Sequence, residues 1–341
     1  MSETFHVLIP RDAPRLLSLV IPVYNEQDAI PFLMNKIREL LDHLPSQAEV
    51  VMVNDGSCDS SISLLLEAAA HDRRFKVLSL ARNFGHQAAA TAGLDAALGD
   101  AVVLMDADLQ DPPELVIEMV REYQKGYDVV YAQRIGREGE GVPKRLTAWV
   151  FYRLMKFLVY KELPPDVGDF RLVSRRCLDA LNAMRETHRF LRGMVSWIGF
   201  PQTAVRFVRP ARVAGQTKYP FRRMLLFAWT AALSFSPLPV RLSFVLGFLL
   251  FSLGGAYAFY ALARFALGMY IVPGWVSLIM INLLTSGAIM MGLGVLGEYV
   301  SRIFEEVKNR PLYVVSYRAN FENTTESRTS SNVVHSERST V

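Results

Sequence analysis

The sequence predicts an α/β domain with a mostly parallel sheet, followed by interfacial amphipathic helices and a C-terminal hairpin of two transmembrane helices. Two observations support this fold class: strand-length apolar runs alternate with helical patterns over residues 16–135, and two long uncharged stretches follow later. Such alternation is typical of parallel sheets covered by helices on both faces. Hydrophobic residues make up 51% of the chain and charged residues 21%, against roughly 45–50% and about 25% in soluble domains. This composition excludes a disordered or fibrous chain and disfavours a purely soluble one.

The strands and helices of the domain can be assigned in order. We expect buried strands at 16–23, 49–54, 75–81, 101–105 and 127–133. Helices are expected between them, the first capped by Asn25 and the others at about 59–71, 87–98 and 113–125. Ligands of parallel sheets bind outside the carboxyl ends of the strands. This rule points to three polar loops, at residues 24–26, 54–57 and 106–110.

Asp106 and Asp108 give the most informative signal, because both carboxylates follow one strand directly. Carboxylate oxygens suit Mg²⁺ or Mn²⁺ that also holds substrate phosphates, and Gln110 could add a neutral oxygen. The alternative is that these acids cap the helix after Pro112. Asp55 at a second strand end favours the functional interpretation, and we expect it to accept hydrogen bonds from a nucleotide base or ribose.

Several other classes of site are disfavoured. No Gly-x-Gly-x-x-Gly follows the first strand and no Walker lysine loop occurs, so neither a dinucleotide cofactor nor a P-loop is expected. The chain has two cysteines, Cys58 and Cys177, which are too far apart in sequence to indicate a disulfide framework or a thiolate metal site. This cysteine usage fits a cytoplasmic catalytic part.

The uncharged stretches 242–263 and 275–296 are each long enough to cross a hydrocarbon core of about 30 Å as a helix rising roughly 1.5 Å per residue. Residues 1–14 contain no signal peptide. Basic residues flank the pair on both sides, whereas only Arg264 lies in the connecting loop. The positive-inside rule therefore places both termini in the cytoplasm. Small residues of the second stretch, such as Gly287 and Gly294, fit either packing within the hairpin or subunit contacts.

Basic segments precede the hairpin. No Asp or Glu occurs between Glu186 and Glu298, and the first part of this stretch is rich in arginine. Helices expected at 144–161 and 219–235 combine apolar residues with Lys and Arg, which is the pattern of interfacial helices. The alternative for 144–161 is a core-facing helix with a solvated basic face. The loop 215–219 could bind anionic headgroups, a lipid phosphate or a sugar-nucleotide diphosphate.

Several ordered motifs resemble the inverting family 2 glycosyltransferases with a GT-A fold. They are 19–26 (LVIPVYNE), 54–57 (NDGS), 106–114 (DADLQDPPE), 168–172 (GDFRL), 215–219 (GQTKY) and 297–303 (GEYVSRI). The chain is most similar, over roughly 16–315, to the polyprenyl-phosphate glycosyltransferases, which include dolichol-phosphate mannose synthase and the bacterial undecaprenyl-phosphate (bactoprenol) glucosyltransferases. Its two-span layout resembles the bacterial branch. Thr217 stands where many relatives carry Ser, and the Gln-x-x-Arg-Trp motif of processive synthases is absent, so transfer of a single sugar is expected.

The resemblance implies roles for individual residues. The nucleotide sugar would be held by Pro22, Tyr24, Glu26, Asp55, Asp106, Ala107 and Arg134. The Mg²⁺ or Mn²⁺ ligands would be Asp106, Asp108 and Gln110. Donor or acceptor phosphates would be bound by Arg171, Arg212 and Lys218. Asp108 and Asp169 would be the catalytic residues, with Asp169 facing the acceptor.

The resemblance also implies a reaction and a place for it. Glucose would move from UDP-glucose to polyprenyl phosphate at the cytoplasmic face of a bacterial inner membrane, with no nucleic acid involved. GDP-mannose, UDP-N-acetylhexosamine or UDP-aminoarabinose remain alternative donors, and a non-catalytic nucleotide-sugar binding protein is a remote alternative. A homo-oligomer stays open. The expected division is an extension (1–15), a GT-A domain (16–218), an interfacial segment (219–240), the hairpin (241–297), a juxtamembrane helix (298–318) and a disordered tail (319–341).

Overall fold

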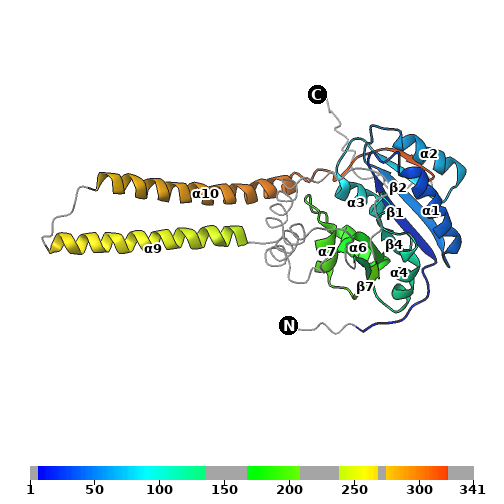
Figure 1. Ribbon diagram of the computed structural model, residues 1–341, viewed down its shortest axis with the longest axis horizontal. Coiled ribbons are helices and arrows are strands. Elements are labelled where there is room, and N and C mark those ends of the chain that lie inside the picture. Colours follow the sequence, from blue (N-terminus) through cyan, green and yellow to red (C-terminus); the bar gives the residue numbers. More distant parts are fainter. Residues whose placement is uncertain (1–6, 135–166, 208–237, 268–273, 322–341) are drawn as a thin grey trace, which may run out of the picture.

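A twisted sheet lies at the centre of the α/β domain in the computed structural model, which describes residues 7–134, 167–207, 238–267 and 274–321 (Figure 1). The strands are β1 (Leu16–Val23), β2 (Gln47–Asn54), β3 (Phe75–Leu80), β4 (Ala101–Leu104), β5 (Val129–Arg134), β6 (Val167–Ser174), β7 (Gln202–Phe207) and β8 (Val315–Ala319). Their order across the sheet is β7-β5-β6-β4-β1-β2-β3-β8. The five strands expected from the sequence are all present, which confirms the α/β fold class.

Strands β1 to β4 are parallel neighbours, with β1 between β2 and β4. Their apolar runs are continuous because helices cover both faces of the sheet. Leu19 and Val20, adjacent on β1, point to opposite faces and are both fully buried. The two faces belong to two separate hydrophobic clusters.

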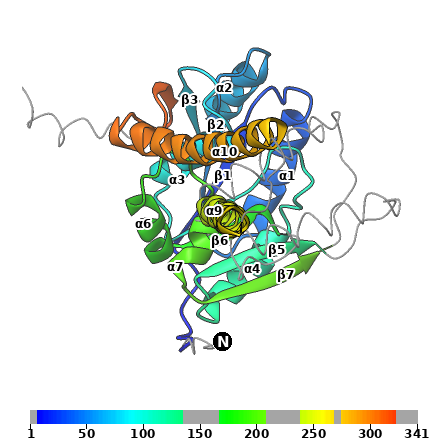
Figure 2. The same ribbon diagram turned by 90° about the vertical axis from the view of Figure 1, so that its left-hand side faces the viewer.

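The helices divide between these faces (Figure 2). They are α1 (Ile30–His43), α2 (Ser61–His71), α3 (His86–Ala96), α4 (Leu115–Gln124), α6 (Arg175–Ala183) and α7 (Leu191–Ile198), followed by α9 (Leu238–Ala266) and α10 (Trp275–Val307). Residues of α1, α2 and α4 pack into one hydrophobic cluster, and residues of α3, α6 and α7 pack into the other. The sheet is thus the middle of three layers.

The cap expected for α1 is wrong. The helix begins at Ile30, after Ala29, and no side chain caps it. Asn25 instead adopts a left-handed φ of 52°, a conformation that Asn tolerates better than most residues. Its Oδ1 accepts the N–H of Cys58 at 2.9 Å. Asn25 therefore ties the β1–α1 loop to the β2–α2 loop.

The strands that follow β5 make the sheet mixed rather than purely parallel. β6 is antiparallel to both β4 and β5, and β7 pairs parallel with β5. The sequence analysis assigned no secondary structure to residues 167–207. β6 matters for function because it carries Asp169 and Arg171 into the middle of the sheet.

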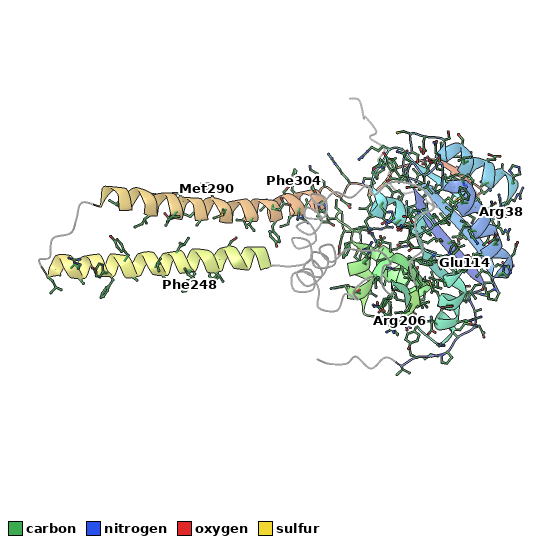
Figure 3. The ribbon with its side chains drawn as sticks, in the orientation of Figure 1. Arg38, Glu114, Arg206, Phe248, Met290 and Phe304 are labelled. Atoms are coloured by element: carbon green, nitrogen blue, oxygen red, sulfur yellow. The ribbon has the colours of Figure 1, made fainter. Side chains whose placement is uncertain are left out.

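Helices α9 and α10 lie side by side and extend away from the α/β domain (Figure 1). Many of their apolar side chains are exposed, including Phe248, Met290 and Phe304, which Figure 3 labels. Within the described residues, one segment, Leu284–Val307, is long and apolar enough to cross a membrane by length and composition. The expected spans 242–263 and 275–296 lie within α9 and α10, and their crossing of a membrane stays a prediction.

The juxtamembrane helix expected over 298–318 differs from the structure. Helix α10 continues without interruption to Val307, and Val315–Ala319 then forms β8, antiparallel to β3. An uncovered β3 would expose unpaired backbone groups at the sheet edge, and β8 satisfies them. Asn320 fixes the end of β8, since its Nδ2 donates to the carbonyls of Ala69 at 2.6 Å and Phe75 at 2.8 Å. The expected helices at 144–161 and 219–235 and most of the tail lie outside the described residues.

Candidate active site

The three polar loops selected from the sequence meet at one edge of the sheet. The last residues of β1 and β2, Val23 and Asn54, are paired neighbours. The β4 loop joins them, because the N–H of Met105 donates to the carbonyl of Val20 at 3.1 Å. The carboxyl ends of parallel strands necessarily lie on the same side. This confirms the expected juxtaposition of the loops that carry Glu26, Asp55 and Asp106.

The first two loops are bound to each other by side chains. Ser57 Oγ accepts the N–H of Asn25 at 3.1 Å, and Ser61 Oγ accepts the N–H of Glu26 at 3.0 Å. Tyr24 is 42% exposed at the edge of this surface. Pro22 is buried within β1, so it shapes the strand end from inside. Tyr24 and Glu26 therefore lie on a loop that is bonded to the loop after β2.

Asp55 is 2% exposed and holds a further loop, which follows β3. Its two carboxylate oxygens accept the N–H groups of Phe84 at 2.7 Å and Gly85 at 2.9 Å. Burial raises the pKa of Asp55 although these two amides act in the opposite direction. The structure thus gives Asp55 a role that the sequence analysis did not foresee, which is to hold the loop after β3 beside the loops at residues 24–26 and 54–57.

Gly56, next to Asp55, is required by its conformation and its surroundings. Its φ is +64°, and a Cβ at this position would lie 2.5 Å from the carbonyl carbon of Arg82. Any side chain would therefore push the β3–α3 loop away. Two loops that are distant in sequence can approach this closely only because residue 56 is glycine.

Asp106 and Asp108 extend from the end of β4. Asp108 Oδ1 accepts the N–H of Gln110 at 3.1 Å, which closes a tight turn around Leu109. Leu109 has a left-handed φ of 57°, which is uncommon for a residue other than glycine and is typical of functional loops. Burial raises the pKa of Asp106, and the neighbouring carboxylates of Asp169 and Asp108 raise it further, against an opposing effect of His86.

Asp169 on β6 lies on the other side of this cluster, 4% exposed. Arg192 binds it with two hydrogen bonds, Nε to Oδ1 at 2.7 Å and Nη2 to Oδ2 at 3.1 Å. His86 Nε2 is 3.3 Å from Asp169 Oδ2 and 3.6 Å from Asp106 Oδ1. Burial alone would raise the pKa of Asp169, but Arg192 and His86 hold it well below its ordinary value. The carboxylate is therefore a stable anion and a weak base.

The pKa of His86 shifts in the opposite direction to that of Asp169. Burial alone would lower the pKa of its imidazole, whereas the carboxylates of Asp169 and Asp106 raise it above its ordinary value. Gln87, the next residue, donates weakly from Nε2 to Asp169 Oδ2 at 3.4 Å. The first turn of α3 thus faces the carboxylate cluster with two polar side chains.

Arg171, two residues after Asp169, faces away from solvent. It is 5% exposed, and its guanidinium donates to the carbonyl of Gly168 at 2.9 Å. Burial lowers its pKa to about 10. These contacts fit a residue that supports the strand, and phosphate binding by Arg171 stays a prediction. Ala107 is buried between the two aspartates of its loop.

The remaining candidates lie at or beyond the limits of the described structure. Arg134 is the last residue of β5, and its side chain is not among those described. Arg212 and Lys218 lie outside the described residues. Their roles stay predictions.

Sequence reasoning missed three side chains of the cluster: His86, Gln87 and Arg192. The strand-end rule could have found the first two, since they follow the third strand just as Asp55 follows the second. Arg192 carries no such signal. It is one arginine among many in a stretch without acids, and only the packing of α7 against β6 brings it to Asp169.

The carboxylates at the end of β4 can be compared with the ligands that divalent cations require. In the described part of the chain, no group of three or more His, Cys, Asp or Glu side chains has the arrangement of a complete metal site. Mg²⁺ commonly takes only one or two protein carboxylates and completes its shell with water and substrate phosphates. Asp106 and Asp108 match that pattern, since they are two carboxylates on one short loop at the end of β4. The residues therefore fit Mg²⁺ or Mn²⁺.

Comparison with known proteins places this site in a family. Residues 18–181 match the model of glycosyl transferase family 2. The chain is 45% identical over 306 residues to an uncharacterized glycosyltransferase, YkcC, of Bacillus subtilis, covering 90% of this chain and 95% of the relative. It is 43% identical to an uncharacterized glycosyltransferase of Synechocystis, with 88% and 94% covered. A bactoprenol glucosyl transferase derived from the SfII prophage of Shigella flexneri is 38% identical, with 89% and 99% covered. The identity and the extent of these matches, together with the carboxylate cluster at the sheet edge, show that the chain is a glycosyltransferase that belongs to family 2.

Proposed function

We propose that this glycosyltransferase transfers one sugar, with glucose from UDP-glucose favoured, onto polyprenyl phosphate at a membrane surface. One observation carries the proposal: the carboxylate cluster of Asp106, Asp108 and Asp169 lies in the same chain as two long helices with exposed apolar side chains. The relative named a bactoprenol glucosyl transferase matches over almost its entire length, hairpin region included. A lipid acceptor explains why a nucleotide-sugar domain carries such helices.

The donor would bind across the ends of β1, β2 and β4. Tyr24, Glu26 and the loop held by Asp55 offer a platform for the nucleoside, with the diphosphate towards Asp106 and Asp108. Asp106, Asp108 and Gln110 would hold Mg²⁺ or Mn²⁺ there. When bound, such a cation would stabilise the charge that grows on the departing diphosphate.

The acceptor phosphate would approach from the side of Asp169. A phosphate monoester has a second pKa of about 6, so near neutral pH it is largely a dianion and needs no general base. Its oxygen forms a bond to the anomeric carbon while the bond from that carbon to the diphosphate breaks, and UDP leaves with the electron pair. Because the nucleophile is already deprotonated, no proton has to move. Asp169, kept anionic by Arg192 and His86, would then position groups around the acceptor.

The membrane parts would hold the site at the height of the lipid phosphate. Helices α9 and α10 would form a transmembrane hairpin with the α/β domain on the cytoplasmic side of a bacterial inner membrane. The basic segments at 144–161 and 219–235 would lie in the interface and attract anionic headgroups. Arg212 and Lys218 would bind phosphate close to this surface, and Gly287 to Gly297 would pack within the hairpin or between subunits.

The test uses the purified full-length protein in vesicles that contain undecaprenyl phosphate. Radiolabelled UDP-glucose, UDP-galactose, UDP-N-acetylglucosamine and GDP-mannose are supplied separately, with and without EDTA, and label in the organic phase is counted. We expect labelling from UDP-glucose that EDTA abolishes and added Mg²⁺ or Mn²⁺ restores. Labelling from a different donor would keep the reaction and change the sugar. Labelling from no donor, with UDP still bound, would contradict the proposal.

A further inference from the structure

The end of α10 that lies nearest the α/β domain makes two polar contacts with the segment 184–190, which joins α6 to α7. Glu306 Oε2 accepts the N–H of Thr187 at 3.0 Å. Glu305 Oε2 lies 2.7 Å from His188 Nε2, with both side chains partly exposed. A carboxylate that accepts a backbone N–H gives a stronger bond than a neutral acceptor. Thr187 and His188 are therefore held directly by the last turn of the long helix.

The segment 184–190 continues directly into the first turn of α7, which begins at Leu191. Arg189 is 9% exposed, and its guanidinium donates to the carbonyls of Met184 at 2.6 Å and Leu181 at 3.1 Å. The N–H of Leu191 donates to Gln87 Oε1 at 3.1 Å. Only three residues separate Thr187 from Leu191, and the one between them that is buried, Arg189, is bonded to the end of α6.

This first turn of α7 carries the active-site contact. Arg192 holds both carboxylate oxygens of Asp169, and Gln87 joins the same carboxylate from α3. Gln87 thus binds the α7 backbone with its oxygen and the catalytic carboxylate with its nitrogen. The backbone of Asp169 is fixed by the pairing of β6 with β4, whereas the orientation of its carboxylate is held by these contacts from the first turns of α7 and α3.

A second set of contacts fastens the chain after α10 to the same region. Tyr313 Oη donates to Asp95 Oδ2 at 2.8 Å, and Arg185 Nη1 donates to the same oxygen at 2.7 Å. Asp95 lies near the end of α3, the helix whose first turn carries His86 and Gln87. Chain segments on both sides of the α10 terminus are therefore bonded to elements that bear active-site residues.

We propose that the last turn of α10, through Glu305 and Glu306, positions the Asp169–Arg192 pair on the acceptor side of the active site. This inference rests on the proposed function for its activity readout. Glu305 and Glu306 are positioning residues that act through Thr187, His188 and the start of α7. The nucleotide loops are tied by separate contacts, Asn25 to Cys58 and Asp55 to Phe84. We therefore expect donor binding to depend less on this connection than the transfer step does.

The test compares the full-length wild type with Glu305→Ala/Glu306→Ala in vesicles. Two acceptors are used, undecaprenyl phosphate in the bilayer and a short-chain isoprenyl phosphate in solution, and UDP affinity is measured separately. We expect kcat to fall about tenfold with both acceptors, a size typical of coupling between two sites. UDP affinity should stay within about twofold, as for surface substitutions. Glu306→Gln, which keeps an oxygen to accept the Thr187 N–H, should retain most of the activity.

The matched control is Glu39→Ala/Glu122→Ala. It removes one carboxylate from α1 and one from α4, which form ion pairs with Lys36 and Lys125. It should leave kcat unchanged. His188→Ala added to Glu305→Ala should cause little further loss, because the two substitutions break one contact. Hydrogen exchange at the amides of Thr187 and Leu191 gives a readout without activity, and protection at both should fall in the Glu305→Ala/Glu306→Ala variant.

Three results would overturn the inference: an unchanged kcat, a loss confined to the bilayer acceptor, or unchanged protection at Leu191. A loss confined to the bilayer acceptor would mean that the contacts only set the height of the domain above the membrane. A wild type that transfers sugar to neither acceptor would contradict the proposed function instead. Hydrogen exchange would still decide whether α10 positions the start of α7.

Discussion

Arg192 on α7 holds the carboxylate of Asp169 on β6 with two hydrogen bonds, Nε to Oδ1 at 2.7 Å and Nη2 to Oδ2 at 3.1 Å. The planar guanidinium matches the two oxygens of a carboxylate, which fixes the plane of the acid as well as its distance. Asp169 is thereby held as an oriented anion beside Asp106. This arrangement favours a positioning role for Asp169 over proton abstraction.

Arg192→Gln should therefore impair transfer more than Arg192→Lys. The amide removes the charge and one bond, while the ammonium keeps the charge but loses the two-point geometry. We expect kcat to fall roughly 100-fold for Gln, a loss typical of misplaced reacting groups, and less for Lys, with UDP affinity unchanged in both. Arg74→Gln, which breaks a surface pair with Asp72 at 2.8 Å, is the matched control. Equal losses for Lys and Gln would argue against an electrostatic role.

Asp169→Asn and Asp108→Ala should separate the roles proposed for these two aspartates. Asp169→Asn keeps the shape of the side chain, and a phosphate dianion needs no base, so turnover should remain measurable. Asp108→Ala removes a proposed metal ligand and should abolish detectable transfer. Single-turnover assays with labelled donor at saturating acceptor measure both. Complete loss in the two variants alike would contradict the positioning role of Asp169.

Gly56→Ala should weaken donor binding. Its Cβ would lie 2.5 Å from a backbone carbon of Arg82, and its φ of +64° disfavours alanine. The strain would displace the loop that Asp55 holds, so we expect the KM for the nucleotide sugar to rise and the stability to fall by about 1–3 kcal/mol. Calorimetric titration with UDP and thermal unfolding measure the two effects. Gly254→Ala, on α9 with open space around the glycine, serves as the control, and a wild-type UDP affinity in Gly56→Ala would refute this account.

Asp128 provides a pH-dependent stability prediction. It is fully buried and accepts bonds from Ser174 Oγ and Arg176 Nε, both at 2.7 Å. Burial alone would raise the pKa of this carboxyl, but these partners and Arg11 lower it. A lowered folded pKa means that the stabilisation is complete above the unfolded value of about 3.9 and is lost as the pH falls through the folded value.

Asp128→Asn should therefore lower the free energy of unfolding by about 1–3 kcal/mol at pH 7, because the buried amide would match Ser174 Oγ and the largely exposed Arg176 poorly. The difference from wild type should shrink below about pH 4. Unfolding curves of both proteins between pH 3 and pH 7 give the comparison. A difference that stays constant across this range would show that the charge of Asp128 contributes nothing.

The sequence was informative where local patterns carry the signal. Continuous apolar runs such as Leu16–Val23 predict strands buried on both faces, and the structure has β1 there. The strand-end rule predicts that Glu26, Asp55 and Asp106 lie on loops at one edge of the sheet, and the structure has these loops there. The rule works because parallel strands leave only one edge where their carboxyl ends meet.

Local patterns failed where a residue's role depends on a distant partner. Asn25 has the identity of a helix cap but binds the N–H of Cys58 in another loop. Residues 315–319 continue what looks like a juxtamembrane segment, yet they form β8 because β3 leaves an edge that must be paired. Neither outcome is encoded in the spacing of neighbouring residues.

The sequence by itself determined the α/β class and the positions of the first five strands along the chain. It also determined the loops at the strand ends and the two long apolar helices. Only the tertiary structure decided that Arg192 and His86 hold Asp169, that Asp55 fixes the β3–α3 loop, and that the end of α10 contacts Thr187. Hydrophobic periodicity is a property of adjacent residues, so it can be read along the chain. Ion pairs and edge-strand pairing join segments far apart in sequence, and their geometry exists only once the sheet and its covering helices have packed.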